Sequence, residues 1–520
     1  MYIEPNTTIK LYSGIPLDNT YKNTLFFANV SAQNSYFHSG IQKYTFARQS
    51  YQRVERGRMR IEVLADNIYD CNYLAFQNEN FGNKWFYAFI NSIDYVNNTT
   101  SEITFEIDVM QTWYFDYELL DSFIDREHTS NDTIGANLVE ENLELGDYII
   151  GDAERLGMDT YKIVVLASEY YVGDWTQDTN WLSTATLVGG TIQGCYYWQF
   201  DATETGRANL VGLLQIYSQK GKTDEILGVF LMPQMFAGCL GQDSPHVEYK
   251  GITKKYGSFE GYTPKNNKLY TYPYNFLYVT NLQGNSAIYP YEYFSGGSGL
   301  CDFNAYGIWS PNSEVTLFPM HYKGYALNYD EALSIKGFPQ CAYTVDAYRA
   351  WLAQNSGSIS VNTGIHGGML MAGIAGATMG LTPLMAGGLV LGGVTGIANT
   401  LARIHDTAVQ PKQTKGQDTN TVLAGAKKLD FLFMNKRIRG EYAKIIDNYF
   451  TMYGYKTNRV KTPNIHVRQR WTYTKTIGCN LKGEAPVDAL KKIVSIYDNG
   501  ITFWVNASEV GNYALSNPTI

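Results

Sequence analysis

The sequence lacks the recurring motifs of catalytic and metal sites. Its 520 residues contain no G-x-x-x-x-G-K-[ST], no G-x-S-x-G and no H-E-x-x-H motif, and no G-x-G-x-x-G at a predicted strand-to-helix junction. The seven histidines are dispersed without the spacing of metal ligands. We therefore predict that the chain is not an enzyme and that it needs no metal or cofactor.

Cysteine is also scarce and poorly placed for pairing. The six cysteines stand at positions 71, 195, 239, 301, 341 and 479, with no Cys-x-x-Cys pair. That spacing argues against a zinc site and provides no disulfide framework. Free thiols suit folding in a reducing cytoplasm. The first residues, Met1 to Pro5, lack a basic or apolar leader, so export by the secretory route is not expected.

Aromatic residues, in contrast, are abundant. They make up 14% of the chain, and 42 of them are tyrosine. Tyrosine is favoured on half-buried pleated surfaces and at interfaces, because one end of its ring is apolar and the other is polar. The additional bias toward Asn, Thr and Gly indicates many turns. The composition therefore predicts a mainly β protein with a few helices, long enough for about two to four domains.

Alternating residues predict a β-hairpin in the N-terminal part. Apolar and polar side chains alternate from Ile103 to Val109, which is typical of a half-buried strand. Just before it, Lys84–Asn91 is a nearly continuous apolar and aromatic run, and the turn-like Asn97–Ser101 joins the two. Further strands are predicted at 162–166 and 275–280. Asp498-Asn-Gly500 is interpreted as a hairpin turn before a last strand at 501–505.

Two helices are expected in the C-terminal half. A short one is predicted over residues 345–355. The other is basic and amphipathic, because apolar side chains recur on one helical face from Ile438 to Tyr453, and Gly454 is a natural stop.

Charged residues are missing from one long stretch. No Asp, Glu, Lys or Arg occurs between Arg349 and Arg403, and Gly364–Ala398 contains no ionisable group except His366. This apolar segment is the predicted site of membrane insertion. The residues predicted to insert are Gly364, Ile365, Met369, Leu370, Met371, Ile374, Gly376, Met379, Gly380, Leu381, Pro383, Leu384, Met385, Gly388, Leu389, Val390, Leu391, Gly392, Val394, Gly396 and Ile397.

The apolar segment divides at Thr382-Pro383. The part before it, at ~1.5 Å rise per residue, is just long enough to cross a hydrocarbon core of ~30 Å, and the part after it is shorter. Because Pro383 interrupts a continuous helix, we expect a helical hairpin or re-entrant loop with glycine spacings that let helices approach closely. The alternative is a buried core helix. Small residues with flexible Met and Leu suit a core less well, and polar stretches flank the segment.

The charge of the chain is divided unevenly. The net charge is −8, yet the part from Arg403 onward carries 18 Lys/Arg against 9 Asp/Glu, which leaves −17 for the first 402 residues. The region Lys427–Lys475, with interleaved aromatics, fits nucleic-acid binding, but we favour a complement to the acidic remainder across subunit contacts. Among candidate acid–base groups, Arg126-Glu-His128 is interpreted as a structural ion pair or capped turn.

Several short motifs together carry a family resemblance. They are Phe76–Asn78, Gly82–Phe89, Phe105–Val109, Gln111–Trp113, Ser122–Ile124, Arg126–His128, Lys268-Leu269, Tyr272–Tyr274, Tyr453–Lys456, Asn458–Val460, Pro463-Asn464, Asp498–Thr502, Trp504 and Gly511–Tyr513. With these motifs the chain resembles the tail knob, or distal tail tube, proteins of small protein-primed podophages of Gram-positive bacteria, the Picovirinae type.

The resemblance implies a homohexameric tube of tail-tube-like β domains at the end of a short tail. It also implies that hydrophobic loops plug the lumen, leave it on triggering, and form a pore in the host cytoplasmic membrane through which viral DNA passes without sequence-specific binding. The implied partners are other tail proteins (the proximal tail tube or lower collar) and membrane lipids. The implied location is the virion tail tip, after assembly in the host cytoplasm.

On this basis the expected domains are a tube-forming 1–150, an inserted β-rich 151–345, a membrane-active loop with linkers at 346–426, and a C-terminal 427–520 that completes the tube domain. Two other functions stay open. The tyrosines and tryptophans fit a secreted-type carbohydrate-binding protein or cell-wall glycosidase, against which the missing leader argues. A standalone pore-forming toxin or holin is less consistent with a large β-rich body.

Overall fold

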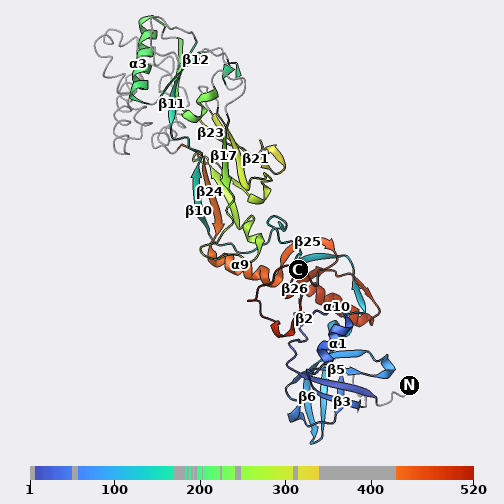
Figure 1. Cartoon of the computed structure of the whole chain (residues 1–520). Coiled ribbons are helices and arrows are strands. Elements are labelled where there is room, and N and C mark those ends of the chain that lie inside the picture. Colours follow the sequence, from blue (N-terminus) through green and yellow to red (C-terminus); the bar gives the residue numbers. More distant parts are fainter. Residues whose placement is uncertain are drawn as a thin grey trace, which may run out of the picture. The chain divides into compact units, whose positions relative to one another are not determined.

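The computed structural model describes the chain as two compact units (Figure 1). Unit 1 comprises residues 1–146, 258–270 and 439–520, and unit 2 comprises residues 147–257 and 271–438. Both are built mainly from β-strands with a few helices, which confirms the predicted fold class. The predicted helix at 345–355 and the predicted loop at 346–426 lie outside the described residues. These are 6–49, 57–168, 182–183, 187–188, 191–192, 196–201, 203–222, 225–239, 247–307, 314–338 and 429–520.

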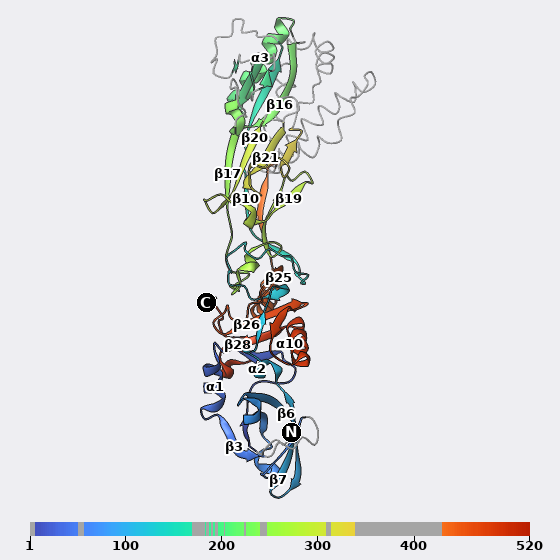
Figure 2. The same cartoon turned by 90° about the vertical axis from the view of Figure 1, so that its right-hand side faces the viewer.

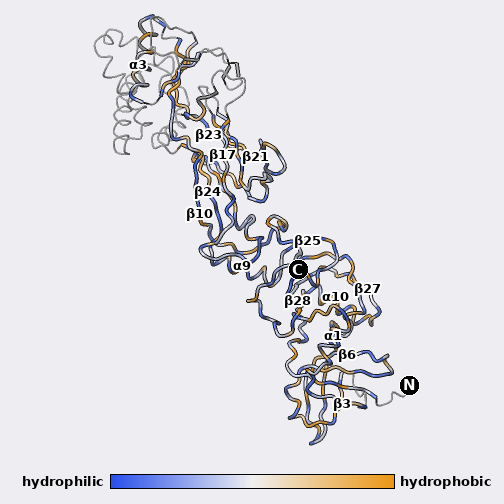
Figure 3. Tube along the Cα trace, viewed as in Figure 1, coloured by the Kyte–Doolittle hydropathy of each residue, from blue (hydrophilic) through white to orange (hydrophobic). Residues whose placement is uncertain are grey.

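The first sheet of unit 1 has the order β3-β1-β5-β6-β7-β4. β6 and β7 are the predicted hairpin, and they pair antiparallel. Ile103 and Phe105 of β7 are buried because alternate residues of this strand point to the core. Figure 3 shows both hydrophilic and hydrophobic residues in this part of unit 1, around the strands labelled β3 and β6. The strands are β1 (Thr7–Ser13), β3 (Gln42–Gln49), β4 (Arg58–Ile61), β5 (Cys71–Gln77), β6 (Trp85–Asn97) and β7 (Thr100–Ile107).

The second sheet of unit 1 joins strands from both ends of the chain. Its order is β2-β28-β26-β9-β25, where β2 is Asn23–Leu25, β28 is Ile501–Trp504, β26 is Trp471–Ile477, β9 is Ser122–Glu127 and β25 is Tyr455–Lys461. β8 (Tyr117–Leu119) and β27 (Leu481–Gly483) form a separate pair. The rings of Trp471 and Trp504 are fully buried, with centroids 5.0 Å apart. Burial of such large aromatic surfaces stabilises this joining of distant segments.

Four helices accompany these sheets in the described part of unit 1: α1 (Val30–His38), α2 (Val109–Thr112), α9 (Gly440–Tyr453) and α10 (Val487–Asn499). α9 corresponds to the predicted amphipathic helix; it buries Ala443, Ile446 and Phe450, and Gly454 is its C-cap, as expected. The prediction was wrong in two respects: Ile438 ends β24 instead of beginning the helix, and α9 is not basic, since it has one lysine against two acidic residues.

The predicted hairpin turn at Asp498–Gly500 is wrong. Asp498 and Asn499 end α10, and Gly500, at φ +91°, caps it by donating its N–H to the Ile496 and Tyr497 carbonyls. Glycine at positive φ serves a helix end as well as it serves a turn.

A short excursion from the middle of the chain, Ser258–Tyr270, belongs to unit 1. Its anchor is the carboxylate of Asp447 on α9, which is fully buried. That carboxylate accepts hydrogen bonds from the Tyr262 hydroxyl at 2.6 Å and the Lys265 N–H at 2.7 Å. It also accepts from the backbone and side-chain N–H groups of Asn266 at 3.1 and 2.8 Å. Several donors together offset the cost of burying the charge.

The described residues of unit 2 form three larger sheets and one small pair. The orders are β10-β24-β18-β19, β12-β15-β11-β16, and β17-β20-β21-β22 with β23 on β21, besides the pair β13-β14. Helix α3 (Glu204–Gln219) packs on β15. The bounds are β10 (Tyr148–Arg155), β11 (Tyr161–Ala167), β12 (Leu182–Ser183), β13 (Leu187–Val188), β14 (Thr191–Ile192), β15 (Tyr196–Asp201), β16 (Ile226–Pro233), β17 (Val247–Thr253), β18 (Asn275–Thr280), β19 (Ser286–Tyr289), β20 (Leu300–Gly307), β21 (Glu314–Tyr322), β22 (Tyr325–Leu327), β23 (Leu333–Lys336) and β24 (Leu432–Ile438).

The strands predicted at 162–166 and 275–280 are β11 and β18. β24 runs between β10 and β18, so a strand from the C-terminal part completes a sheet of unit 2, whereas residues 439–520 belong to unit 1. The predicted domain boundaries themselves stay predictions.

Candidate membrane-active segment and its attachment

Every predicted site residue, from Gly364 to Ile397, lies outside the described residues, so the conformation of the apolar segment stays a prediction. None of the helices in the described ranges is long and apolar enough to cross a membrane. The structure does place the residues on either side of 339–428, which is the stretch that contains the segment.

The chain enters this stretch from β23 and the two residues that follow it. β23 pairs antiparallel with β21, and Ile335 is fully buried. Phe338, the last described residue before the stretch, is 1% exposed and belongs to the large apolar core of unit 2. An aromatic side chain with that degree of burial fixes the chain at this point.

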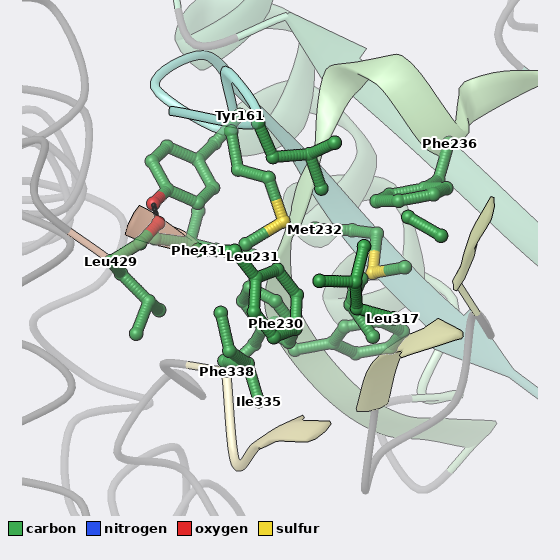
Figure 4. Close-up of a cluster of buried hydrophobic side chains, with 14 of the residues drawn as sticks. Tyr161, Phe230, Leu231, Met232, Phe236, Leu317, Ile335, Phe338, Leu429 and Phe431 are labelled. Carbon is green, nitrogen blue, oxygen red and sulfur yellow. Dashed lines mark hydrogen bonds between the residues drawn. The ribbon is translucent and has the colours of Figure 1, made fainter. Parts of the chain in front are cut away.

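The chain returns through Leu429, Asp430 and Phe431, which are all buried. Leu429 and Phe431 belong to the same core as Phe338, and Figure 4 shows the three side chains in one cluster with Ile335 and Phe230. The two ends are therefore attached to a single core in one unit. A conformational change in the stretch between the two ends therefore need not remove either end from this core.

Asp430 holds the returning end by hydrogen bonds. Its carboxylate accepts hydrogen bonds from the N–H groups of Gly157 at 3.0 Å, Met158 at 3.1 Å and Phe431 at 2.7 Å. The Phe431 carbonyl accepts from Leu156 N–H at 3.1 Å. Burial raises the pKa of Asp430, while these three N–H donors favour the ionised form. These hydrogen bonds attach residues 430–431 to the loop between β10 and β11.

The sequence of this chain is also similar to that of known proteins. A family model for the C-terminal domain of tail knob protein gp9 of Bacillus phage phi29 matches residues 242–518. The chain belongs to the phage tail knob protein family. This confirms the predicted family.

Other comparisons agree with this membership. A model for the N-terminus of caudoviral major tail proteins matches residues 5–118. The tail knob proteins gp9 of Bacillus phages phi29 and B103 are 28% and 26% identical to the chain, with 98% of both proteins covered in each case. The structure of the bacteriophage C1 tail knob protein gp12 has a TM-score of 0.63 at 14% identity, over 99% of this chain and 100% of that one, which shows a shared fold.

As a tail knob protein, the chain is a structural component of a phage tail. The relatives are named as structural tail proteins, which agrees with the prediction of a non-enzyme. Within the described ranges, no group of three or more His, Cys, Asp or Glu side chains is placed to hold a metal ion.

Arg126, Glu127 and His128 have structural partners in this tail knob protein. Arg126 pairs with Glu141 and donates to the Gly454 carbonyl at 2.7 Å. Glu127, which is buried, lies 2.8 Å from Lys461 Nζ. These contacts support the interpretation of this motif as structural.

His128 is buried and uses both ring nitrogens. Nδ1 accepts the Tyr473 N–H at 2.8 Å, and Nε2 lies 3.2 Å from the Thr451 carbonyl, to which it donates. Burial, with the charge of Arg468 as a second cause, lowers the pKa of His128 to about 3. The ring is therefore neutral near pH 7, with its proton on Nε2.

Part of the basic C-terminal region is neutralised within unit 1. Some of its lysines and arginines pair with acidic residues from the N-terminal part of the same chain, and the expected contacts between subunits stay a prediction. The pairs are Lys461–Glu127 at 2.8 Å, Arg468–Asp132 at 3.8 Å, Lys475–Asp125 at 3.1 Å, Lys482–Glu118 at 3.0 Å and Lys492–Glu106. Side chains engaged in this way are less available to a nucleic-acid backbone.

Sequence reasoning missed the role of two buried carboxylates, those of Asp430 and Asp447. Asp430 stands alone in the apolar run Leu429–Phe433, and Asp447 lies on the buried face of α9. A single acid within an apolar pattern is a usable signal, because a buried carboxylate needs several donors.

Proposed function

We propose that Gly364–Ala398 is a membrane-active segment through which this tail knob protein opens a path for the genome across the host cytoplasmic membrane. In the proposal the segment occupies the lumen of a homohexameric tube before infection. Its release lets six copies insert together and line a channel for viral DNA, which is not read by sequence. The other proposed partners are the proximal tail tube or lower collar proteins.

The observation that carries the proposal is the absence of Asp, Glu, Lys and Arg from residues 350–402. Each such charge at the centre of a bilayer costs about 2.5–3.5 kcal/mol on insertion scales, so a stretch of this length without one is compatible with lipid. The small residues at Gly376/Gly380 and Gly388/Gly392/Gly396 suit close helix packing in lipid. Pro383 divides the segment into two arms.

The attachment of both ends supports a segment that moves without unfolding its unit. Phe338 on one side and Leu429 to Phe431 on the other are held in one core. Conformational change between them is compatible with an intact unit 2.

Dye release from anionic liposomes tests this function. We expect the full-length protein to release dye, and a variant in which 364–398 is replaced by a Gly/Ser linker of equal length to release little. Leu370→Asp and Leu389→Asp should reduce release, because each places a charge in the apolar arms. Gln413→Asp, in the polar stretch, is the matched control and should behave as wild type.

Equal release by the linker-replaced protein contradicts the membrane role. Imaging of the purified protein by negative stain tests the tube separately, since a persistent monomer without rings is incompatible with a homohexamer.

A further inference from the structure

Residues 129–146 of unit 1, here called the strap, form most of the connection from β9 to β10. No helix or strand lies between Glu127 and Tyr148. Glu141 is the only buried residue of the strap, so its attachment rests mainly on polar contacts. The strap contains no Lys, Arg or His, and its four acidic residues are Asp132, Glu140, Glu141 and Glu144.

The carboxylate of Glu141 lies in a site that three other segments build. It pairs with the guanidinium of Arg126 on β9 and, at 2.6 Å, with the ammonium of Lys268 in the excursion 258–270. It also accepts the N–H of Lys456 on β25 at 3.1 Å. Figure 2 shows β25 and β26, the two neighbours of β9 in this sheet. The side chains of Arg126 and Lys268 are only 11% and 2% exposed, so both cations are largely shielded from water.

Two cations in such a site need an anion beside them. Removal of one partner from a buried ion pair leaves a charge whose lost hydration is no longer offset. Lys268 Nζ also lies 5.5 and 5.4 Å from the ring centroids of Phe450 and Tyr455, but a ring attracts a cation less strongly than a carboxylate does. If Glu141 leaves, the site therefore still favours an anion.

A second carboxylate of the strap lies beside another cation. Asp132 is 3.8 Å from Nη2 of Arg468, and its backbone carbonyl accepts from the Asn267 side chain at 2.7 Å. Lys456 and Arg468 both belong to the basic region Lys427–Lys475, whose composition fits nucleic-acid binding. The acidic strap thus covers part of that basic region from within the same chain.

We propose that the strap is an autoinhibitory cover, and that the phosphodiester backbone of double-stranded DNA binds Arg126, Lys268 and Lys456 when the strap is displaced. Guanidinium, ammonium and backbone N–H groups are the donors that contact DNA phosphates. DNA carries one charge about every 1.7 Å along its axis, so it can also reach Arg468, as the strap does.

Displacement of the strap is compatible with an intact unit 1. A segment with few buried apolar contacts and no regular structure opens at a lower free energy than the sheet beneath it. The inference rests on the proposed passage of viral DNA, which brings this ligand to the chain.

Fluorescence anisotropy of a short labelled DNA duplex of mixed sequence, titrated with the full-length protein at low salt, tests the proposal. Glu141→Gln weakens the hold on the strap and should bind DNA about tenfold more tightly than wild type, with an affinity that falls as salt rises. Glu140→Gln is the matched control, because it removes the same charge from an exposed neighbour, and it should stay within about twofold of wild type. Addition of Lys268→Met to Glu141→Gln should abolish the gain.

Amide hydrogen exchange of the same variants reports on the strap itself. Exchange in 133–146 should be faster in Glu141→Gln than in wild type or Glu140→Gln, while exchange in α10 stays the same in all three, which shows that unit 1 remains folded.

Unchanged exchange in 133–146 of Glu141→Gln would overturn the proposal, and so would faster exchange there without tighter DNA binding. Equal gains for Glu140→Gln and Glu141→Gln would reduce the effect to net charge and equally overturn it. Preference for purified wall teichoic acid over the duplex would assign the surface to another polymer. None of these measurements involves lipid, so their failure leaves the membrane proposal to the liposome experiment.

Discussion

Replacement of His128 by Asn should remove an acid-sensitive part of the stability of this tail knob protein. The pKa of His128 is lowered to about 3 by burial, against an ordinary value of 6.5. Below pH 6.5 the unfolded chain therefore binds a proton that the folded chain does not, so the free energy of unfolding falls as the pH falls toward 3. At about 1.4 kcal/mol per pH unit, the loss from pH 7 to pH 4.5 is about 2.5 kcal/mol.

Asn is a suitable replacement because its Oδ1 can accept the Tyr473 N–H in place of Nδ1. The Thr451 carbonyl keeps a donor, since Trp471 Nε1 donates to it at 2.9 Å. His128→Asn is thus expected to be less stable at pH 7, because packing is lost, while the difference from wild type shrinks by about 2.5 kcal/mol at pH 4.5. Urea unfolding followed by tryptophan fluorescence at pH 7, 5.5 and 4.5 measures it.

A buried residue without a titratable side chain provides the control for this prediction. Ile124→Val, at a fully buried position of unit 1, should differ from wild type by the same amount at all three pH values. If His128→Asn also runs parallel to wild type, His128 does not carry the acid sensitivity and the reasoning is refuted.

Two further stability predictions concern unit 1. Asp447→Ala leaves the donors of Tyr262, Lys265 and the buried Asn266 without their acceptor, and it should lower the free energy of unfolding by about 1–3 kcal/mol. Proteolysis within 258–270 should accelerate, and unchanged cleavage there would contradict this. Gly454→Ala should lower the free energy of unfolding by about 3 kcal/mol or more, because φ is +64° and a Cβ would meet the Glu127 carbonyl oxygen at 2.1 Å. Gly478→Ala, at φ +70° with open space around it, should lower it by only about 1 kcal/mol. Urea unfolding measures both. Equal costs for the two glycines would contradict a steric role for Gly454.

Local patterns predicted the elements whose signal is periodic. The hairpin β6-β7 and helix α9 follow from alternation and from a 3.6-residue apolar repeat, and both are present. The same local approach failed at Asp498–Gly500, where a turn-like triplet ends a helix. Ala489, Ile493, Ile496 and Tyr497 are the buried face of that helix, and their spacing carried the missing signal.

The long-range organisation was less accessible from sequence. Nothing local indicates that Ser258–Tyr270 returns to unit 1, because its anchor, Asp447, lies about 180 residues further along the chain. The apolar segment could be found because absence of charge is a local property. Its attachment at Phe338 and Asp430 could not, because burial and hydrogen bonding there depend on strands from elsewhere in unit 2.

The central claim is that Gly364–Ala398 enters lipid, and an environment-sensitive fluorophore tests it most directly. Single cysteines for labelling are placed at Leu389, within the segment, and at Lys415, in the polar stretch that follows. On addition of anionic liposomes, the label at 389 should shift its emission to the blue and become inaccessible to an aqueous quencher, while the label at 415 should change little. A label at 389 that stays quenchable, under conditions where the protein binds the liposomes, would contradict the account.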